Sequence, residues 1–150
     1  MAGQTQRVIR KTFMELLEER PLNEITVKLI VERCGINRKT FYNHYRDIPE
    51  LMERILTDEV DAIMARYTRV DSIEECLGHA IEFALQHKRA ALHIYRSVGR
   101  DVYVESTLKL CDYLVRTYMA KVEGAAELDK EDHEILVRLY RGQLFGLITE

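Results

Sequence analysis

The sequence predicts an all-α protein: an N-terminal three-helix bundle that contains a helix-turn-helix, then a C-terminal helical bundle, with about eight helices in total. Apolar residues recur at helical spacing over most of the chain, strand-like alternation never persists for more than a few residues, and only two prolines occur in 150 residues. We therefore expect a head over residues 1–47 and a body over residues 48–150.

The first expected helix covers residues 4–19 and buries one face, with Ile9 and Phe13 among its apolar positions. Thr5 is its expected N-cap, because a threonine hydroxyl can accept from the unpaired N–H groups of a first turn. Pro21 stops the helix, since the residue before a proline disfavours the helical region.

Two short helices are expected next, over residues 27–34 and 38–45. Thr26 and Asn37 can cap them, and Gly35 can end the first one in a left-handed conformation. Several apolar residues lie where two helices that cross at a steep angle would face each other: Ile30, Val31, Cys34, Ile36, Phe41 and Tyr45. That spacing, with glycine in the turn, is the helix-turn-helix pattern.

The outward side chains of this motif suit DNA. Arg and Lys pair with phosphate or guanine, Asn with adenine, and Thr with a thymine methyl group. We expect Arg38, Lys39 and Thr40 at base edges with Asn37 and Asn43 as further candidates, and Thr26, Tyr42, His44 and Arg46 at phosphates. An ordinary helical hairpin with a solvated polar face is the alternative, but the caps, the turn and the donor-rich helix together favour a DNA-binding motif.

About twenty positions of this stretch also resemble a known family. Thr26 opens the first helix, Cys34-Gly35-Ile36 forms the turn, and Thr40-Phe41-Tyr42-Asn43-His44-Tyr45 follows the pattern T-F-Y-x-H-aromatic. The run resembles the TetR family of bacterial transcription regulators. The resemblance implies a homodimer that joins through its last two helices and binds a palindromic operator in double-stranded DNA. It also implies a body that holds a small-molecule effector.

Two features depart from the usual family pattern. Ile48 stands where a basic residue often contacts phosphate, and Arg46 is expected to supply that charge instead. The run from Tyr45 to Leu51 is more similar to a sub-group of short regulators that includes dihydroxyacetone-kinase regulator-like proteins.

Five further helices are expected after the motif. Asp47 can cap the first, with Pro49 in its first turn, where a missing N–H is tolerated. The other expected caps are Asp71 or Ser72, Asp101, and Asp129 or Asp132, and the expected spans are 49–69, 73–87, 88–98, 101–123 and a last helix to the chain end. The second of these is expected to turn Cys76, Leu77, Ala80, Ile81, Ala84 and Leu85 inward.

Gly142 and Gly146 lie four residues apart on one face of the last expected helix. A glycine costs about 1 kcal/mol in a helix interior, so a pair of them indicates that another helix approaches closely. We expect a homodimer interface that includes Gly142, Leu144, Phe145 and Gly146, in preference to close packing within one chain, because one head reads only half of a symmetric site. The helix reaches Glu150 without a C-cap, and the final helix of the family is expected to be absent.

The resemblance implies a ligand pocket, which would be lined here by His79, Phe83, Tyr95, Tyr103 and Tyr113. Each of these side chains also fits an ordinary core. The sequence predicts no cofactor, no metal site and no enzyme, because it has no glycine-rich phosphate loop, no nucleophile elbow and no paired cysteine or histidine metal motif.

Charge and cysteine content agree with a DNA-binding head on a separate sensing body. Residues 1–56 hold ten Lys/Arg against eight Asp/Glu, whereas residues 57–150 hold twelve against seventeen. Cys34, Cys76 and Cys111 predict buried thiols in a reducing compartment. Without an eighteen-residue apolar run or a signal peptide, the chain is expected to be cytoplasmic and to avoid membranes.

These observations predict a sequence-specific transcriptional regulator, a dimeric repressor that a small-molecule ligand releases from its operator. The alternative is a helical interaction protein whose body binds a partner protein, with weak or secondary DNA binding. Operator-specific affinity distinguishes the two.

Overall fold

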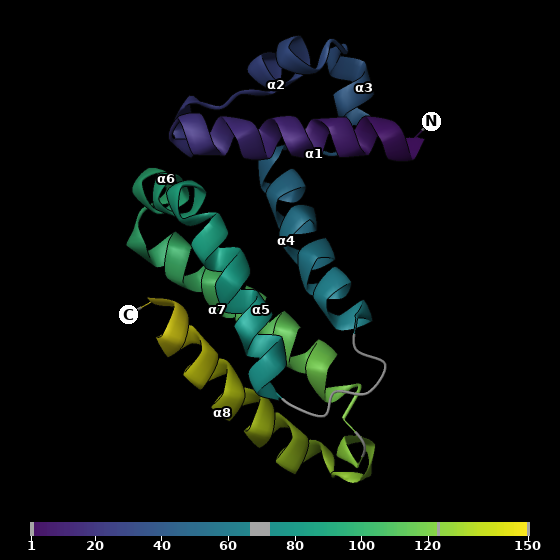
Figure 1. Cartoon of the computed structure of the whole chain (residues 1–150), viewed down its shortest axis with the longest axis vertical. Helices are drawn as coiled ribbons and strands as arrows, with labels where there is room; N and C mark the ends of the chain where they lie inside the picture. Colours follow the sequence, from purple (N-terminus) through teal and green to yellow (C-terminus); the bar gives the residue numbers. More distant parts are fainter. Residues whose placement is uncertain (1, 67–72, 123, 150) are drawn as a thin grey trace. The chain divides into compact units, whose positions relative to one another are not determined.

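The computed structural model describes residues 2–66, 73–122 and 124–149, and it describes only the backbone of residues 2, 73, 74, 76 and 77. All regular structure in these ranges is helical, which confirms the all-α prediction (Figure 1). The described ranges contain eight α-helices: α1 (Ala2–Glu19), α2 (Val27–Cys34), α3 (Arg38–Tyr42), α4 (Ile48–Ala65), α5 (Ile73–Gln86), α6 (Lys88–Val98), α7 (Arg100–Met119) and α8 (Lys130–Thr149). Two 3₁₀ turns, η1 (Leu22–Glu24) and η2 (Ala125–Glu127), join them. No described helix is both long enough and apolar enough to cross a membrane.

Several helix ends differ from the predicted ones. α1 begins at Ala2, so Thr5 lies inside the helix and is not its N-cap. α7 begins at Arg100, which places Asp101 in its first turn. The N-cap of α8 is Asp129, because its Oδ1 accepts the N–H of Asp132 at 2.8 Å. α4 ends at Ala65, and the rest of its predicted span from residue 67, like the Asp71 and Ser72 caps, lies outside the described residues.

The chain forms two compact units. The head unit consists of Met1–Ile55 and His87–Tyr103, and the body unit consists of Leu56–Gln86 and Val104–Glu150. This division differs from the predicted boundary after residue 47, because the start of α4 and the whole of α6 pack with the head.

The head unit is built around α1, which has α2 and α3 on one side and α6 on the other (Figure 1). Its buried core joins residues of five helices: Ile9, Phe13, Leu16, Leu17, Ile25, Ile30, Val31, Phe41, Tyr45, Leu51, Ile55 and Ala90. Polar contacts also attach α6 to the head. His93 Nδ1 donates to the carbonyl oxygen of Leu17 at 2.5 Å, and Ser97 Oγ accepts the N–H of Asn23 at 3.2 Å. The prediction for the head missed this helix, because an ordinary amphipathic pattern does not reveal which unit a helix joins.

The body unit has a second core, formed mainly by α7 and α8 with the end of α4. Its buried residues are Val60, Ile63, Met64, Cys111, Leu114, Val115, Met119, Ala125, Val137 and Leu144. Burial raises the pKa of the Cys111 thiol to about 11, so this cysteine is inert at neutral pH. Cys34 is half-buried rather than buried, and the side chain of Cys76 lies outside the described part.

The predicted inward face of α5 is largely wrong. Ile81, Ala84 and Leu85 are exposed, and of the four predicted inward residues whose side chains are described only Ala80 packs against the body core. The apolar face of α5 is wider than the part of the helix that contacts the body core, so apolar residues outside that contact stay exposed.

Candidate nucleic-acid interface

The turn between α2 and α3 is held by hydrogen bonds that begin with its caps. Thr26 Oγ1 accepts the N–H of Leu29 at 3.2 Å, which confirms Thr26 as the N-cap of α2. Gly35 then adopts φ 69° and ψ 31°, a left-handed conformation that favours glycine. The N–H of Gly35 donates to Glu32 and that of Ile36 to Val31, so two orphan carbonyls at the helix end are satisfied.

α3 is short and tightly anchored. Asn37 Oδ1 accepts the N–H of Thr40 at 2.8 Å and the hydroxyl of Thr40 at 3.0 Å, which confirms Asn37 as the N-cap. The helix ends at Tyr42 and not at residue 45 as predicted, because the N–H of His44 donates to the carbonyl of Phe41 and tightens the last turn. Tyr42 and Asn43 therefore stand at the end of the helix.

Aromatic packing fixes how α3 lies on the head. Phe41 is fully buried, with its ring 5.8 Å from the ring of Tyr45 and 5.5 Å from the ring of Tyr42. The other residues predicted to face each other also join the head core: Ile30 and Val31 are buried, and Cys34 and Ile36 are packed against them. α3 can thus present its outer side as a rigid surface.

The residues predicted to contact DNA are exposed to different degrees. Exposed side chains are those of Thr26, Asn37, Arg38, Lys39, Tyr42, Asn43 and Arg46, whereas Thr40 and His44 are half-buried. The hydroxyls of Thr26 and Thr40 both take part in capping, so for Thr40 the methyl group is what remains to meet a base. Arg38 and Lys39 lie in the first turn of α3, the part of a recognition helix that faces base edges.

A carboxylate network holds the turn between α3 and α4. Asp47 Oδ1 accepts the N–H of Glu50 at 2.8 Å, and this bond, helped by Arg46, holds the pKa of Asp47 below its usual range. Glu50 accepts the backbone N–H of Arg46 at 2.6 Å and the guanidinium of Arg54 at 2.7 Å, and the first of these contacts contributes most to its lowered pKa. The Arg46 side chain also pairs with Asp47 at 3.2 Å, so the predicted phosphate contact of Arg46 would require this pair to open.

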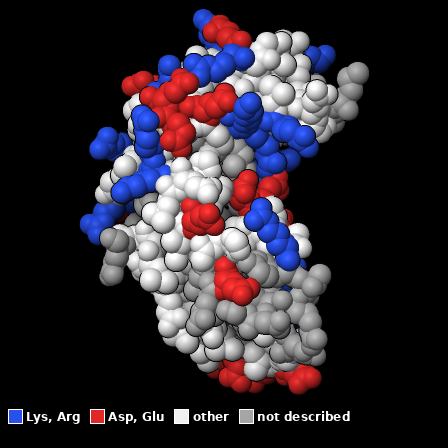
Figure 2. Space-filling model, in the orientation of Figure 1, with Lys and Arg blue, Asp and Glu red and all other residues white. Residues whose placement is uncertain are grey.

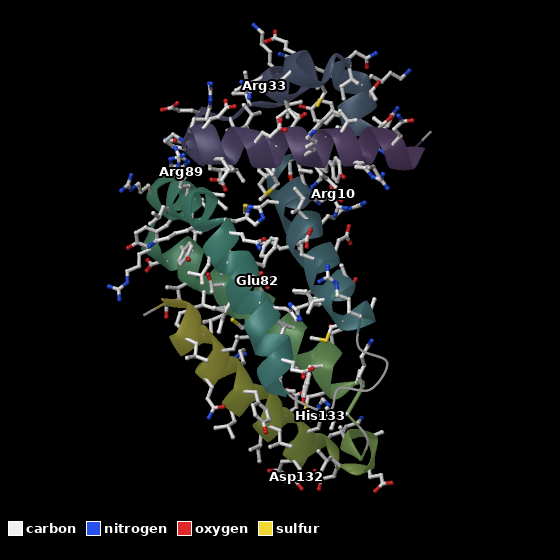
Figure 3. The ribbon with its side chains drawn as sticks, viewed as in Figure 1. Arg10, Arg33, Glu82, Arg89, Asp132 and His133 are labelled. Atoms are coloured by element: carbon white, nitrogen blue, oxygen red, sulfur yellow. The ribbon has the colours of Figure 1, made fainter. Side chains whose placement is uncertain are left out.

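Sequence reasoning missed the second half of this network. Arg54 lies 5.7 Å from the centre of the Tyr45 ring. Arg10, which Figure 3 labels, donates to the carbonyl of Arg54 at 2.9 Å. These contacts join α1, the end of the motif and α4. The pairing of Glu50 and Arg54 four residues apart was the available signal.

The net charges of the two structural units differ more than those of residues 1–56 and 57–150. The head unit contains fourteen Lys/Arg against nine Asp/Glu, a balance of +5, and the body unit contains eight against sixteen, a balance of −8. The change arises because residues 87–103 bring four basic residues and one acidic residue to the head. A positive head favours association with a polyanion at ordinary salt.

Removal of the α3 cap gives a testable stability change. Asn37→Ala is expected to lower the free energy of unfolding by about 1 kcal/mol, because two donors of Thr40 lose their acceptor. Asn37→Asp is the matched control: it keeps the cap and the stability, but its negative charge should weaken DNA binding. Urea denaturation followed by circular dichroism measures the first effect, and a loss below a few tenths of a kcal/mol for the alanine variant would contradict it.

The residues predicted to line a ligand pocket are divided between the units. Tyr95 and Tyr103 meet edge to face in the head unit, with ring centres 5.0 Å apart. His79, Phe83 and Tyr113 belong to the body unit, where the Tyr113 hydroxyl donates to Asp61 at 2.8 Å.

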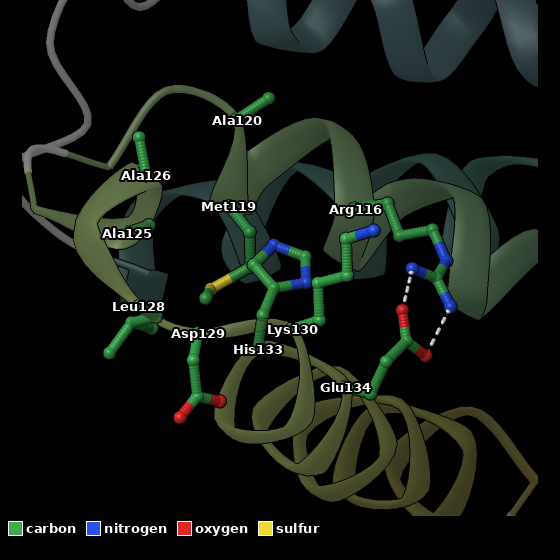
Figure 4. A pocket seen from close by; sticks show the side chains of 10 residues that line it. All are labelled: Arg116, Met119, Ala120, Ala125, Ala126, Leu128, Asp129, Lys130, His133 and Glu134. Carbon is green, nitrogen blue, oxygen red and sulfur yellow. Dashed lines mark hydrogen bonds and ion pairs between the residues drawn. The ribbon is translucent and has the colours of Figure 1, made fainter.

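A pocket of about 500 Å³ in the body unit contains none of these five residues (Figure 4). It is lined by Arg116, Met119, Ala120, Ala125, Ala126, Leu128, Asp129, Lys130, His133 and Glu134. Arg116 and Glu134 form a two-pronged ion pair at its edge, at 2.6 and 2.8 Å.

The predicted dimer residues do not share one face of α8. Gly142 is exposed and Gly146 half-exposed, whereas Leu144 is 2% exposed in the core of its own body unit and Phe145 packs against that core. Leu144 therefore stabilises the protomer and is not available to a partner.

Comparison with known proteins decides the nature of the motif. Residues 9–55 match the sequence model of a family described as "Bacterial regulatory proteins, tetR family". This segment is a tetR-family domain. The tetR-family domain begins within α1, contains the helix-turn-helix and ends within α4, in agreement with the resemblance inferred from the sequence.

Two further comparisons extend this result. Over 55 residues the chain is 33% identical to the "HTH-type dhaKLM operon transcriptional activator DhaS" of Lactococcus lactis subsp. lactis (strain IL1403), which is 37% of this chain and 29% of that protein. The chain thus matches less than a third of the length of this relative. A solved structure, "Dihydroxyacetone kinase operon activator DhaS", has a TM-score of 0.66 and 16% identity, and the match covers 96% of this chain and 81% of that one. The second likeness shows a shared fold beyond the tetR-family domain.

Proposed function

We propose that this chain is a DNA-binding transcriptional regulator that places α3 in the major groove of its operator. The observation that carries the proposal is the geometry of the motif: α2 and α3 are capped, Gly35 makes the turn, and Phe41 fixes the helix on the core. The tetR-family match of the same residues supports it.

The proposal assigns different roles to the exposed residues. Arg38 and Lys39 read base edges from the first turn of α3, with Asn43 and the Thr40 methyl group as neighbours. Tyr42, His44 and Arg46 hold phosphates, and Arg46 replaces the positive charge that Ile48 lacks. A regulator of this kind acts in the bacterial cytoplasm, where the DNA is.

The deciding experiment is binding to the DNA upstream of its own gene, measured by fluorescence anisotropy over a range of salt concentrations with random duplex as competitor. We expect specific binding tighter than random binding by about 10³ or more. Equal and weak binding of both duplexes would contradict the proposal and favour the alternative of a protein that acts through a partner protein.

We propose further that the chain binds a palindromic operator as a homodimer through an exposed stripe of α8. Ile135 is 55% and Leu139 53% exposed, and both share a helical face with Gly142 and Gly146. A Cβ built on either glycine would meet none of the described neighbouring atoms within 4 Å, so close packing inside the protomer does not account for these glycines. A second α8 that crosses this stripe would account for both.

A single substitution tests the interface. Gly146→Leu is expected to raise protomer stability by about 0.5–1 kcal/mol through helix propensity, yet weaken the dimer about tenfold or more by blocking close approach. Gly78→Leu on α5 is the matched control, because its site is equally open and should gain propensity without affecting dimerisation. Sedimentation equilibrium measures the dimer dissociation constant of both variants. An unchanged constant for Gly146→Leu would contradict this interface.

Two further questions belong to the proposal: whether the chain represses or activates transcription, and whether a small-molecule effector controls it. Repression was predicted from the sequence, whereas the name of the Lactococcus relative describes an activator. A reporter gene behind the operator, compared with and without the chain, gives the sign directly. A small-molecule effector would raise the melting temperature of the protein in proportion to the logarithm of its concentration above the Kd.

A further inference from the structure

The outward face of α6 combines positive charge with apolar side chains. Residues Lys88, Arg89, Leu92, Tyr95 and Arg96 recur at the spacing of one helical face, and all five are exposed. Leu92 is 42% and Tyr95 44% exposed. We call these five residues the α6 surface.

The opposite face of α6 is occupied. Ala90 is buried in the head core, Ile94 packs against it, and His93 and Ser97 bond to α1 and η1. His87, just before the helix, lies 3.5 Å from the carboxylate of Glu18. The α6 surface is therefore carried rigidly by the DNA-binding head, and a molecule bound there is attached to the head itself.

The charges of the α6 surface are not neutralised locally. No ion pair links Lys88, Arg89 or Arg96 to any residue in the described part of the chain, and residues 87–103 contain Asp101 as their one acidic residue. Figure 2 shows basic side chains gathered at the place that α6 occupies in Figure 1, and Figure 3 locates Arg89 at the start of the helix. Such a surface is complementary to an acidic one.

Two observations favour a protein over DNA as the occupant. α6 lies on the side of α1 opposite to α2 and α3, so a duplex in contact with α3 runs along the other side of the head (Figure 1). In addition, Leu92 lies among Lys88, Arg89 and Arg96 on the α6 surface, and Tyr95 lies beside it at the edge, against the ring of Tyr103. Apolar side chains next to basic ones are typical of a protein interface, whereas phosphate contacts need no apolar part.

We propose that the α6 surface docks an acidic segment of a partner protein, whose carboxylates meet Lys88, Arg89 and Arg96 and whose apolar side chains cover Leu92 and Tyr95. This goes beyond operator binding, since it gives the head a second interaction surface that does not use α3. A regulator with both surfaces can bring its partner to the operator.

The test uses the full chain and a short fluorescein-labelled peptide that carries Glu and Leu at helical spacing. One control peptide has Lys in place of every Glu, and another has only Glu. Wild type should bind the Glu/Leu peptide, with affinity that falls as salt rises, and should bind the Lys peptide much more weakly. Failure to bind the Glu/Leu peptide at millimolar concentration, or equal binding of the Lys peptide, would overturn the proposal.

Variants locate the binding. Arg89→Gln with Arg96→Gln should weaken peptide binding about tenfold, and Leu92→Ala about fivefold. The matched control, Arg66→Gln with Lys130→Gln, removes the same charge from exposed positions of the body unit and should leave peptide binding unchanged. Thermal unfolding confirms that all variants are folded.

Operator binding provides the second readout. The Arg89/Arg96 double variant should keep operator affinity within about twofold of the control double variant, because exposed charges beyond about 8 Å are screened at physiological salt. A selective loss of operator affinity would assign the α6 surface to DNA and overturn a protein-docking role. If wild type binds the peptide but no operator, the docking surface stands and the proposed function fails.

Discussion

Replacing Phe41 with alanine is expected to lower the free energy of unfolding by about 3–5 kcal/mol, the largest stability effect of any single change in the motif. The side chain is fully buried between α3 and the head core, and it contacts the rings of Tyr42 and Tyr45. The substitution leaves a cavity and removes the one buried side chain of α3. A domain whose total stability is typically about 5–15 kcal/mol would lose a large fraction of it.

Urea denaturation followed by circular dichroism measures this change. Phe41→Leu is the matched control, because it keeps most of the buried volume and should lose clearly less stability than the alanine variant. The alanine variant should also lose binding to operator and to random DNA together, since α3 is no longer held in place. A loss of stability below about 1 kcal/mol would mean that Phe41 does not anchor the recognition helix.

Arg38→Ala is expected to reduce operator affinity by about 1–3 kcal/mol and to relax the preference at about one base pair, with little effect on random DNA. Arg38 is the first residue of α3 and is exposed, so its guanidinium can reach base edges without repacking of the head. Its stem makes no contribution to the buried core, and stability should therefore change little.

Tyr42→Phe provides the contrasting result. This substitution removes only the hydroxyl that is proposed to hold a phosphate, so affinity for operator and random DNA should fall by the same factor. Both variants are measured by anisotropy with the operator duplex and a scrambled duplex. Equal losses on both duplexes for both variants would refute the division between base-reading and phosphate-holding residues.

The places where prediction and structure disagree share a physical origin. At the end of α3 the carbonyl of Phe41 accepts both the N–H of His44 and the N–H of Tyr45, so a tightened turn competes closely with one more turn of α-helix. The exposed Ile81 and Leu85 follow an amphipathic pattern correctly but have no core to meet among the described residues. Leu144 and Gly142 are two residues apart and lie on nearly opposite sides of α8. The rotation of the helix about its axis decides which of them packs against the core of the protomer.

The sequence by itself determined the all-α class, the caps Thr26, Asn37 and Asp47, the left-handed turn at Gly35 and the donor-rich recognition helix. These features depend on hydrogen bonds and backbone preferences within about four residues, which a local pattern contains in full. Only the tertiary structure decided that α6 belongs to the head, that Glu50 and Arg54 hold the turn before α4, and which face of α8 remains open. Those outcomes depend on contacts between residues far apart in the chain, such as His93 with Leu17, and periodicity indicates that a helix has a buried face without indicating its partner.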